Sequence, residues 1–191
     1  MKNFFKTLYS KTVDRSKFRE IFSRFTVFIL PLFYWGREPE MAGVAIIIAA
    51  VLIRAWGAGC LSKDQSVAGG PYILVRHPLY LGSCLLAVGM IVTLHHWVVT
   101  LFVGGITALT YWHTIRHEEK NLIARFGKSY TDYMKTAGPL WPKPKGIKTF
   151  ITGKQPRIGF SLKQYMKNKE YECLLGVLVV LVYIWVGQNY Q

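Results

Sequence analysis

Residues 41–61, MAGVAIIIAAVLIRAWGAGCL, form an apolar stretch whose only charged residue is Arg54. A helix needs about 20 apolar residues to cross the hydrocarbon core of a bilayer, so this stretch predicts a transmembrane helix. Arg54 lies seven residues before the end of the stretch. Its long side chain could extend to the membrane interface, or it could be a functional charge inside the membrane.

Four further apolar stretches predict an all-α integral membrane protein with about five transmembrane helices. Three of them resemble the first in composition: residues 79–95, 97–112 and 173–187. The fourth, residues 21–35, contains Arg24 and is interrupted by Pro31. We therefore expect this stretch to be a kinked or partly interfacial span.

The positive charges predict the orientation of these helices. The chain of 191 residues has a net charge of +14, although 51% of its residues are hydrophobic. Of the 24 Lys and Arg residues, 22 lie in three segments: residues 1–24, 62–78 and 113–171. The opposite side would hold only Arg37, so the positive-inside rule predicts that the N-terminus and these segments face the cytoplasm. Because the charge is divided among membrane spans and no nucleic-acid-binding motif occurs, a nucleic-acid partner is not expected.

Three regions are expected along the chain. Residues 1–24 form a basic amphipathic N-terminal segment, residues 25–142 a membrane-embedded core, and residues 143–191 a basic cytoplasmic segment followed by a C-terminal transmembrane helix. Both basic segments mix large apolar side chains with Lys and Arg, a composition that suits anionic lipid head-groups. The positive-inside bias alone accounts for their charge equally well.

A polar cluster interrupts the apolar pattern at residues 69–82, GGPYILVRHPLYLG, where the chain re-enters the membrane. Its side chains could be interfacial anchors or could bind a charged ligand. The predicted hairpin formed by 79–95 and 97–112 returns the chain to the same face, next to a second cluster, His113–Lys120. Glu118 and Glu119 could belong to the same site, or they could begin a separate solvated helix that ends before Gly127. The three cysteines have no metal-ligand or redox spacing, so no metal site is predicted.

The two clusters together resemble the isoprenylcysteine carboxyl methyltransferase family and its relatives among the phospholipid methyltransferases. The similarity covers roughly residues 41–142. The matching residues are Gly70, Pro71, Tyr72, Arg76, His77, Pro78, Tyr80 and Gly82, then Glu118, Glu119, Leu122, Phe126, Gly127, Tyr130 and Tyr133, and finally Leu140, Trp141 and Pro142.

This resemblance implies a methyltransferase that binds S-adenosylmethionine at the cytoplasmic face and takes a lipid or other lipophilic acceptor from the bilayer. It implies the following cofactor contacts: Tyr72, His77, Pro78, Leu79, Tyr80 and Glu118, with the backbone of Asp64, Gln65, Ser66 and Val67 against the adenosine.

Three residues are candidates for the reaction itself. Arg76 is placed to hold the cofactor's carboxylate or an acidic acceptor head-group. Glu119 (or His117) is a candidate base if the acceptor is an amine, whereas a carboxylate acceptor needs none. Family members often carry an Arg where this chain has Thr114, and Arg116 (or His113) is the candidate substitute.

Two other functions are consistent with the sequence. Sterol and steroid reductases hold a nicotinamide cofactor with a similar motif, but this chain has Leu79 in place of their Asn and Ser83 in place of their acidic residue. Those differences favour the methyltransferase. A non-catalytic lipid-binding or scaffold protein could also keep the same fold.

Overall fold

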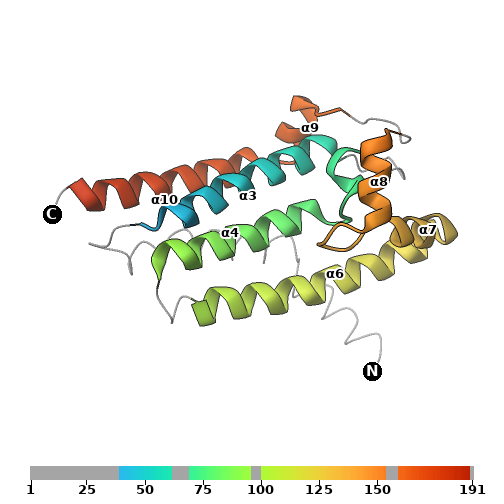
Figure 1. The fold of residues 1–191 in the computed structure, drawn as a ribbon, viewed down its shortest axis with the longest axis horizontal. Helices are drawn as coiled ribbons and strands as arrows, with labels where there is room; N and C mark the ends of the chain where they lie inside the picture. The colour runs from blue at the N-terminus through green and yellow to red at the C-terminus, as the bar shows by residue number, and fades with distance from the viewer. Residues whose placement is uncertain (1–38, 62–68, 96–99, 154–158, 190–191) are drawn as a thin grey trace, which may run out of the picture. The chain divides into compact units, whose positions relative to one another are not determined.

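A computed structural model describes residues 39–61, 69–95, 100–153 and 159–189 of the chain (Figure 1). The predicted span 21–35 and the predicted cofactor contacts Asp64, Gln65, Ser66 and Val67 lie outside these ranges. The chain divides into two compact units, Pro39–Leu174 and a second one made of Met1–Glu38 and Leu175–Gln191. Every described residue of the candidate site belongs to the first unit.

The described residues form helices and no strand, which confirms the all-α fold class. The longer elements are α3 (Met41–Cys60), α4 (Pro78–Leu94), α6 (Gly105–Phe126) and α10 (Tyr171–Asn189). Shorter helices are η2 (Gly70–Ile73), η3 (Thr100–Gly104), α7 (Lys128–Thr136), α8 (Pro144–Thr152) and α9 (Leu162–Lys167). Among the described helices, only α3 is both long and apolar enough to cross a membrane, and α4 and Tyr171–Gly187 are shorter apolar helices. Five transmembrane helices therefore remain a prediction.

Small residues let α3 and α4 pack closely and antiparallel. A Cβ atom added to Gly89 would lie 2.6 Å from Cγ1 of Ile47 and 3.0 Å from the carbonyl oxygen of Gly43. At the other end of the pair, a Cβ atom on Gly57 would lie 3.3 Å from Cγ of Pro78. Close backbone approach at small residues is typical of helices that associate in lipid. This packing fixes the position of Pro78, and with it the start of α4.

The α6 helix continues from the apolar stretch into the second polar cluster without a break. Glu118 lies thirteen residues after α6 begins at Gly105. The alternative in which Glu118 and Glu119 begin a separate helix is therefore wrong. The physical reason is that residues 105–126 contain no proline and, after Gly105, no glycine, so nothing ends the helix at the membrane surface. The predicted stop is confirmed, because Gly127 follows α6 with a φ of +54°.

Two loops meet where α4 begins. Val75 pairs with Gly138 in an isolated parallel bridge, and the backbone N–H groups of Arg76 and His77 donate to the carbonyls of Gly138 (2.7 Å) and Pro139 (3.1 Å). The α4 helix then starts at Pro78, as predicted, with the proline in its first turn, where no backbone donor is needed. These bonds hold Arg76 and His77 in a fixed position at the end of α4.

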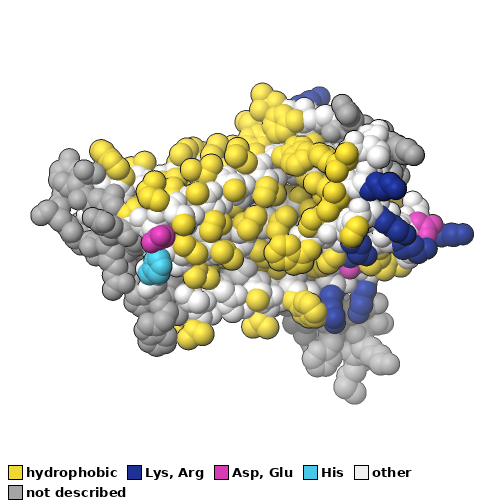
Figure 2. Space-filling view, in the orientation of Figure 1, with side chains coloured by type: hydrophobic (Ala, Val, Ile, Leu, Met, Phe, Trp, Pro, Cys, Tyr) yellow, Lys and Arg dark blue, Asp and Glu magenta, His cyan; other side chains and the backbone are white. Residues whose placement is uncertain are grey.

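The surface of this unit is apolar along the helices and basic at one end. Exposed side chains include Leu52 (64%), Leu101 (66%) and Leu109 (74%). In Figure 2, hydrophobic side chains cover the surface along α3 and α4, and Lys and Arg gather where α7 and α8 lie. Large exposed apolar surfaces are typical of proteins that contact a membrane or a partner.

Candidate active site

An ion pair between Arg76 and Glu119 joins the two polar clusters. The Nε and Nη2 atoms of Arg76 donate to Oε1 of Glu119 at 2.8 and 2.5 Å. Its Nη1 atom donates to the carbonyls of Ala137 (2.6 Å) and Met134 (3.4 Å). The Arg76 and Glu119 side chains are only 5% and 15% exposed. Arg76 therefore connects the loop before α4 to α6 and to the end of α7.

His77 lies between the two glutamates. Its Nε2 atom is 3.3 Å from Oε1 of Glu119, and its Nδ1 atom is 3.8 Å from Oε2 of Glu118. Burial lowers the pKa of His77 below its usual value, although both carboxylates act in the opposite direction. The ring is thus neutral at pH 7, and it stacks on Tyr80 at a centroid distance of 5.4 Å. A neutral imidazole carries one donor and one acceptor, so only one of the two nitrogens can donate to a carboxylate.

Three buried polar atoms beside this ion pair have no hydrogen-bond partner among the described residues: the hydroxyls of Tyr72 and Tyr130 and Oε2 of Glu118. Burial contributes most to the raised pKa values of both phenols, and Glu118 raises them further, whereas the nearby Arg76 guanidinium lowers the pKa of Tyr130. The pKa of Tyr130 rises to about 12, so its hydroxyl stays protonated. Buried polar groups without partners are rare in folded proteins, and each calls for an explanation such as a catalytic role or a bound water, ion or ligand.

The arrangement offers complementary groups to a ligand that carries both charges. Two phenol hydroxyls can donate to an anionic group, and the Oε2 atom of Glu118 can accept from a cationic one. The Tyr133 hydroxyl supports this arrangement by donating to the Tyr72 carbonyl at 2.6 Å, which ties α7 to η2.

Several predicted residues lie elsewhere. Arg116 is exposed, and its guanidinium lies 4.2 Å from the centre of the Trp112 ring. His117 is also exposed and lies 3.1 Å from the amide of Asn121. Pro78 and Leu79 face Gly57 of α3. Their proposed roles stay predictions that rest on the resemblance.

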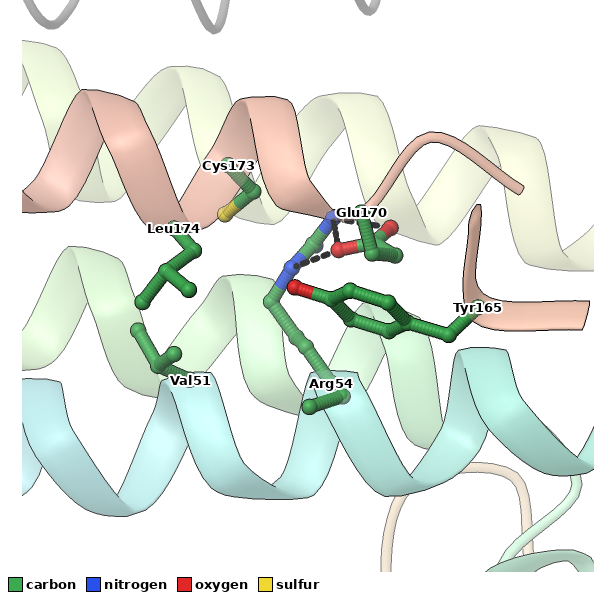
Figure 3. Close-up of a pocket in the computed structure, with 7 residues that line it drawn as sticks. Val51, Arg54, Tyr165, Glu170, Cys173 and Leu174 are labelled. Carbon is green, nitrogen blue, oxygen red and sulfur yellow. Dashed lines mark hydrogen bonds and ion pairs between the residues drawn. The ribbon is translucent and has the colours of Figure 1, made fainter. Parts of the chain in front are cut away.

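Arg54, in α3, belongs to a second network of polar side chains, which does not include Arg76 or Glu119 (Figure 3). It donates to Glu170 at 2.7, 2.8 and 3.1 Å (Figure 3). It also donates to the Leu79 carbonyl at 3.2 Å and to the Ser83 hydroxyl. Its side chain is 16% exposed, and the acidic partner Glu170 satisfies the buried guanidinium. The interpretation that Arg54 extends to the membrane interface stays a prediction. A small cavity beside this pair is lined by Val51, Arg54, Ala55, Tyr165, Glu170, Cys173 and Leu174.

Sequence reasoning assigned no role to Tyr130, Tyr133 or Glu170. The two tyrosines had a usable signal, because a spacing of three places both on one face of a helix, and their rings are 5.7 Å apart. Glu170 and Glu172 are the two acidic residues just before the last apolar stretch, so the sequence offers both as partners for a charge within a span and does not choose between them.

Residues 40–129, just under half of the chain, match the family model described as phospholipid methyltransferase. The match confirms the resemblance drawn from the two motifs. It includes Arg76, His77, Glu118 and Glu119 and ends one residue before Tyr130. No curated protein and no solved structure matches the chain.

Proposed function

With residues 40–129 assigned to the phospholipid methyltransferase family, we propose that this protein transfers a methyl group from S-adenosylmethionine to a lipid acceptor at the cytoplasmic face of a membrane. The family implies methyl transfer to lipid-type substrates and is membrane-associated, and its members generally use S-adenosylmethionine. The observation that carries the proposal is the set of three buried polar atoms, on Tyr72, Glu118 and Tyr130, that have no hydrogen-bond partner among the described residues.

These atoms fit the charges of S-adenosylmethionine. Its methionine part carries a carboxylate and an ammonium group, and its sulfonium carries the methyl group that is transferred. The Tyr72 and Tyr130 hydroxyls would hold the carboxylate, and Oε2 of Glu118 would hold the ammonium. His77 lies against the same oxygen and would complete this side of the site.

Arg76 and Glu119 would act mainly by positioning the residues around them. Both Arg76 and His77 contact the same oxygen of Glu119, so this carboxylate fixes two of the matched residues at once. Methyl transfer is an in-line displacement, and correct alignment of the reactants is worth up to roughly 7–11 kcal/mol of the barrier. An amine acceptor must also lose a proton, and Glu119 is the candidate base within the cluster.

Calorimetry on the purified protein tests this function against both alternatives. We expect S-adenosylmethionine to bind with one site per chain and NADPH not to bind, because the orphaned groups suit an amino acid moiety. Transfer of a labelled methyl group to a phospholipid in reconstituted vesicles is the second measurement. Binding of NADPH alone would indicate a reductase, and binding of neither ligand would indicate a non-catalytic protein.

The proposed orientation predicts opposite accessibility for the two ends of this unit. Positions 95 and 135 are both exposed, and Lys135 is 72% exposed. In a variant without native cysteines, we expect a membrane-impermeant thiol reagent outside intact cells to label His95→Cys and to spare Lys135→Cys. After permeabilisation both positions should react, which controls for accessibility. The reverse labelling pattern would contradict the cytoplasmic site.

A further inference from the structure

The α8 helix separates apolar and basic side chains onto two faces. Ile147, Phe150 and Ile151 share one face by their spacing, and Lys145 and Lys148 lie on the other. Ile147, Phe150 and Ile151 are 41%, 42% and 75% exposed, so the described chain leaves much of this apolar face uncovered.

The packing of α8 determines which surface this face continues. A Cβ atom on Gly146 would lie 2.8 Å from the Ile73 carbonyl oxygen, so α8 is pressed against the loop before α4. On its apolar face, Phe150 contacts Trp56 in the last turns of α3, with ring centroids 6.2 Å apart. The apolar face of α8 is therefore in contact with the C-terminal end of α3.

Trp56 is the end of an exposed apolar stripe along α3. Ile48, Leu52 and Trp56 are four residues apart, and they are 52%, 64% and 36% exposed. Residues at this spacing lie on one face of a helix. Because α3 is long and apolar enough to cross a membrane, this stripe is suited to face lipid, and Phe150 and Ile151 extend it onto α8.

The segment of the chain that contains α8 carries only positive charges. Residues 133–169 contain nine Lys and Arg residues and neither Asp nor Glu. Figure 2 shows the described Lys and Arg side chains gathered at the α7 and α8 end of the molecule. A helix with a lipid-facing apolar side and a cationic side is suited to lie in the interface of an anionic membrane.

We propose that α8 is an interfacial helix that docks on anionic phospholipid head-groups of the membrane crossed by α3. Phe150 and Ile151 enter the acyl boundary, and Lys145 and Lys148 bind lipid phosphates. This surface is separate from the proposed cofactor site, since none of these four residues contributes an atom to the Arg76–Glu119 cluster.

The experiment uses the full chain without native cysteines, reconstituted in phosphatidylcholine nanodiscs with or without phosphatidylglycerol. An environment-sensitive fluorophore is attached at Ile151→Cys on the apolar face or at Thr152→Cys on the polar face. Brominated acyl chains, which quench fluorophores within the acyl region, report the depth of each label. We expect strong quenching at position 151 and weak quenching at position 152, with phosphatidylglycerol increasing the quenched fraction at 151.

Charge substitutions test whether anionic lipid is the ligand. Each lysine near an anionic surface contributes a factor of about five, so Lys145→Gln with Lys148→Gln should lower the docking constant in phosphatidylglycerol roughly 25-fold. The matched control is Lys128→Gln with Lys135→Gln on α7, which removes the same charge and should have much less effect. The proposal would be overturned by equal quenching at positions 151 and 152, or by a quenched fraction at position 151 that is the same with and without phosphatidylglycerol. Shielding at 151 that depends on protein concentration would overturn it too, by indicating a second copy instead of lipid.

Discussion

Replacing Arg76 with Ala is expected to destabilise the protein by about 3–5 kcal/mol, because the change leaves the buried Glu119 carboxylate without its charged partner. It also leaves the Ala137 carbonyl without the guanidinium that bonds to it at 2.6 Å. The measurement is the free energy of unfolding of the detergent-solubilised protein in a denaturant titration. The Arg76→Ala variant should also bind S-adenosylmethionine more weakly. Arg76 and His77 contact the same oxygen of Glu119, so the loss of Arg76 should disturb the position of His77 in the proposed site.

A double substitution separates lost stability from a lost ligand contact. The double variant Arg76→Ala, Glu119→Ala leaves no buried charge without a partner. It should therefore be more stable than the single variant Arg76→Ala. The surface pair Lys135 and Asp132 is the matched control, and Lys135→Ala should change stability by less than about 1 kcal/mol. Full stability in Arg76→Ala, combined with a loss of cofactor affinity alone, would show that Arg76 binds the ligand and does not position Glu119.

Glu118→Gln is expected to weaken S-adenosylmethionine binding by roughly tenfold to more than a hundredfold, with little change in stability. A charge-assisted hydrogen bond is worth about 1.5–3 kcal/mol, which corresponds to this range of affinity. Stability should be kept because the Oε2 atom of Glu118 has no hydrogen-bond partner among the described residues. Calorimetric titration of wild type and variant measures the difference.

The neighbouring carboxylate provides the control. Glu119→Gln removes a charge one residue away, but it breaks the contacts to Arg76 and His77, so it should lower stability as well as affinity. His77→Ala should likewise weaken cofactor binding, because its ring lies between both glutamates. Equal affinities of wild type and Glu118→Gln would remove Glu118 from the proposed site.

The sequence predicted the features that depend on local composition. The apolar runs gave α3, α4 and α10 within a few residues, Pro78 marked the start of α4, and Gly127 marked the end of α6. Pro78 and Gly127 act through their own backbone geometry, and the apolar runs act through the preference of their side chains for lipid. The proximity of His77 to Glu118 also followed, because a hairpin between two apolar helices must return the chain to the same face.

Features that depend on the choice of partner could not be predicted in this way. Arg54 had two plausible environments, and only the fold shows that Glu170, far away in the sequence, pairs with it. The carbonyls of Met134 and Ala137 that bind Arg76 carry no side-chain signal at all, since every residue has such a carbonyl. The continuity of α6 does not follow from the apolar pattern, because the polar residues after 112 mark the end of the apolar stretch and not the end of the helix.

In the proposed membrane arrangement, the unbroken α6 helix connects its first turns in the membrane to the two glutamates. Thirteen residues separate Gly105 from Glu118, and a helix rises about 1.5 Å per residue, so the carboxylates are held roughly 20 Å from the start of α6. If the first turns of α6 lie in the bilayer as proposed, a bilayer that is thicker or thinner than α6 requires would tilt or shift the whole helix, because the helix has no break before the glutamates. In that arrangement the height of Glu118 and Glu119 above the acyl region would depend on the thickness of the surrounding bilayer.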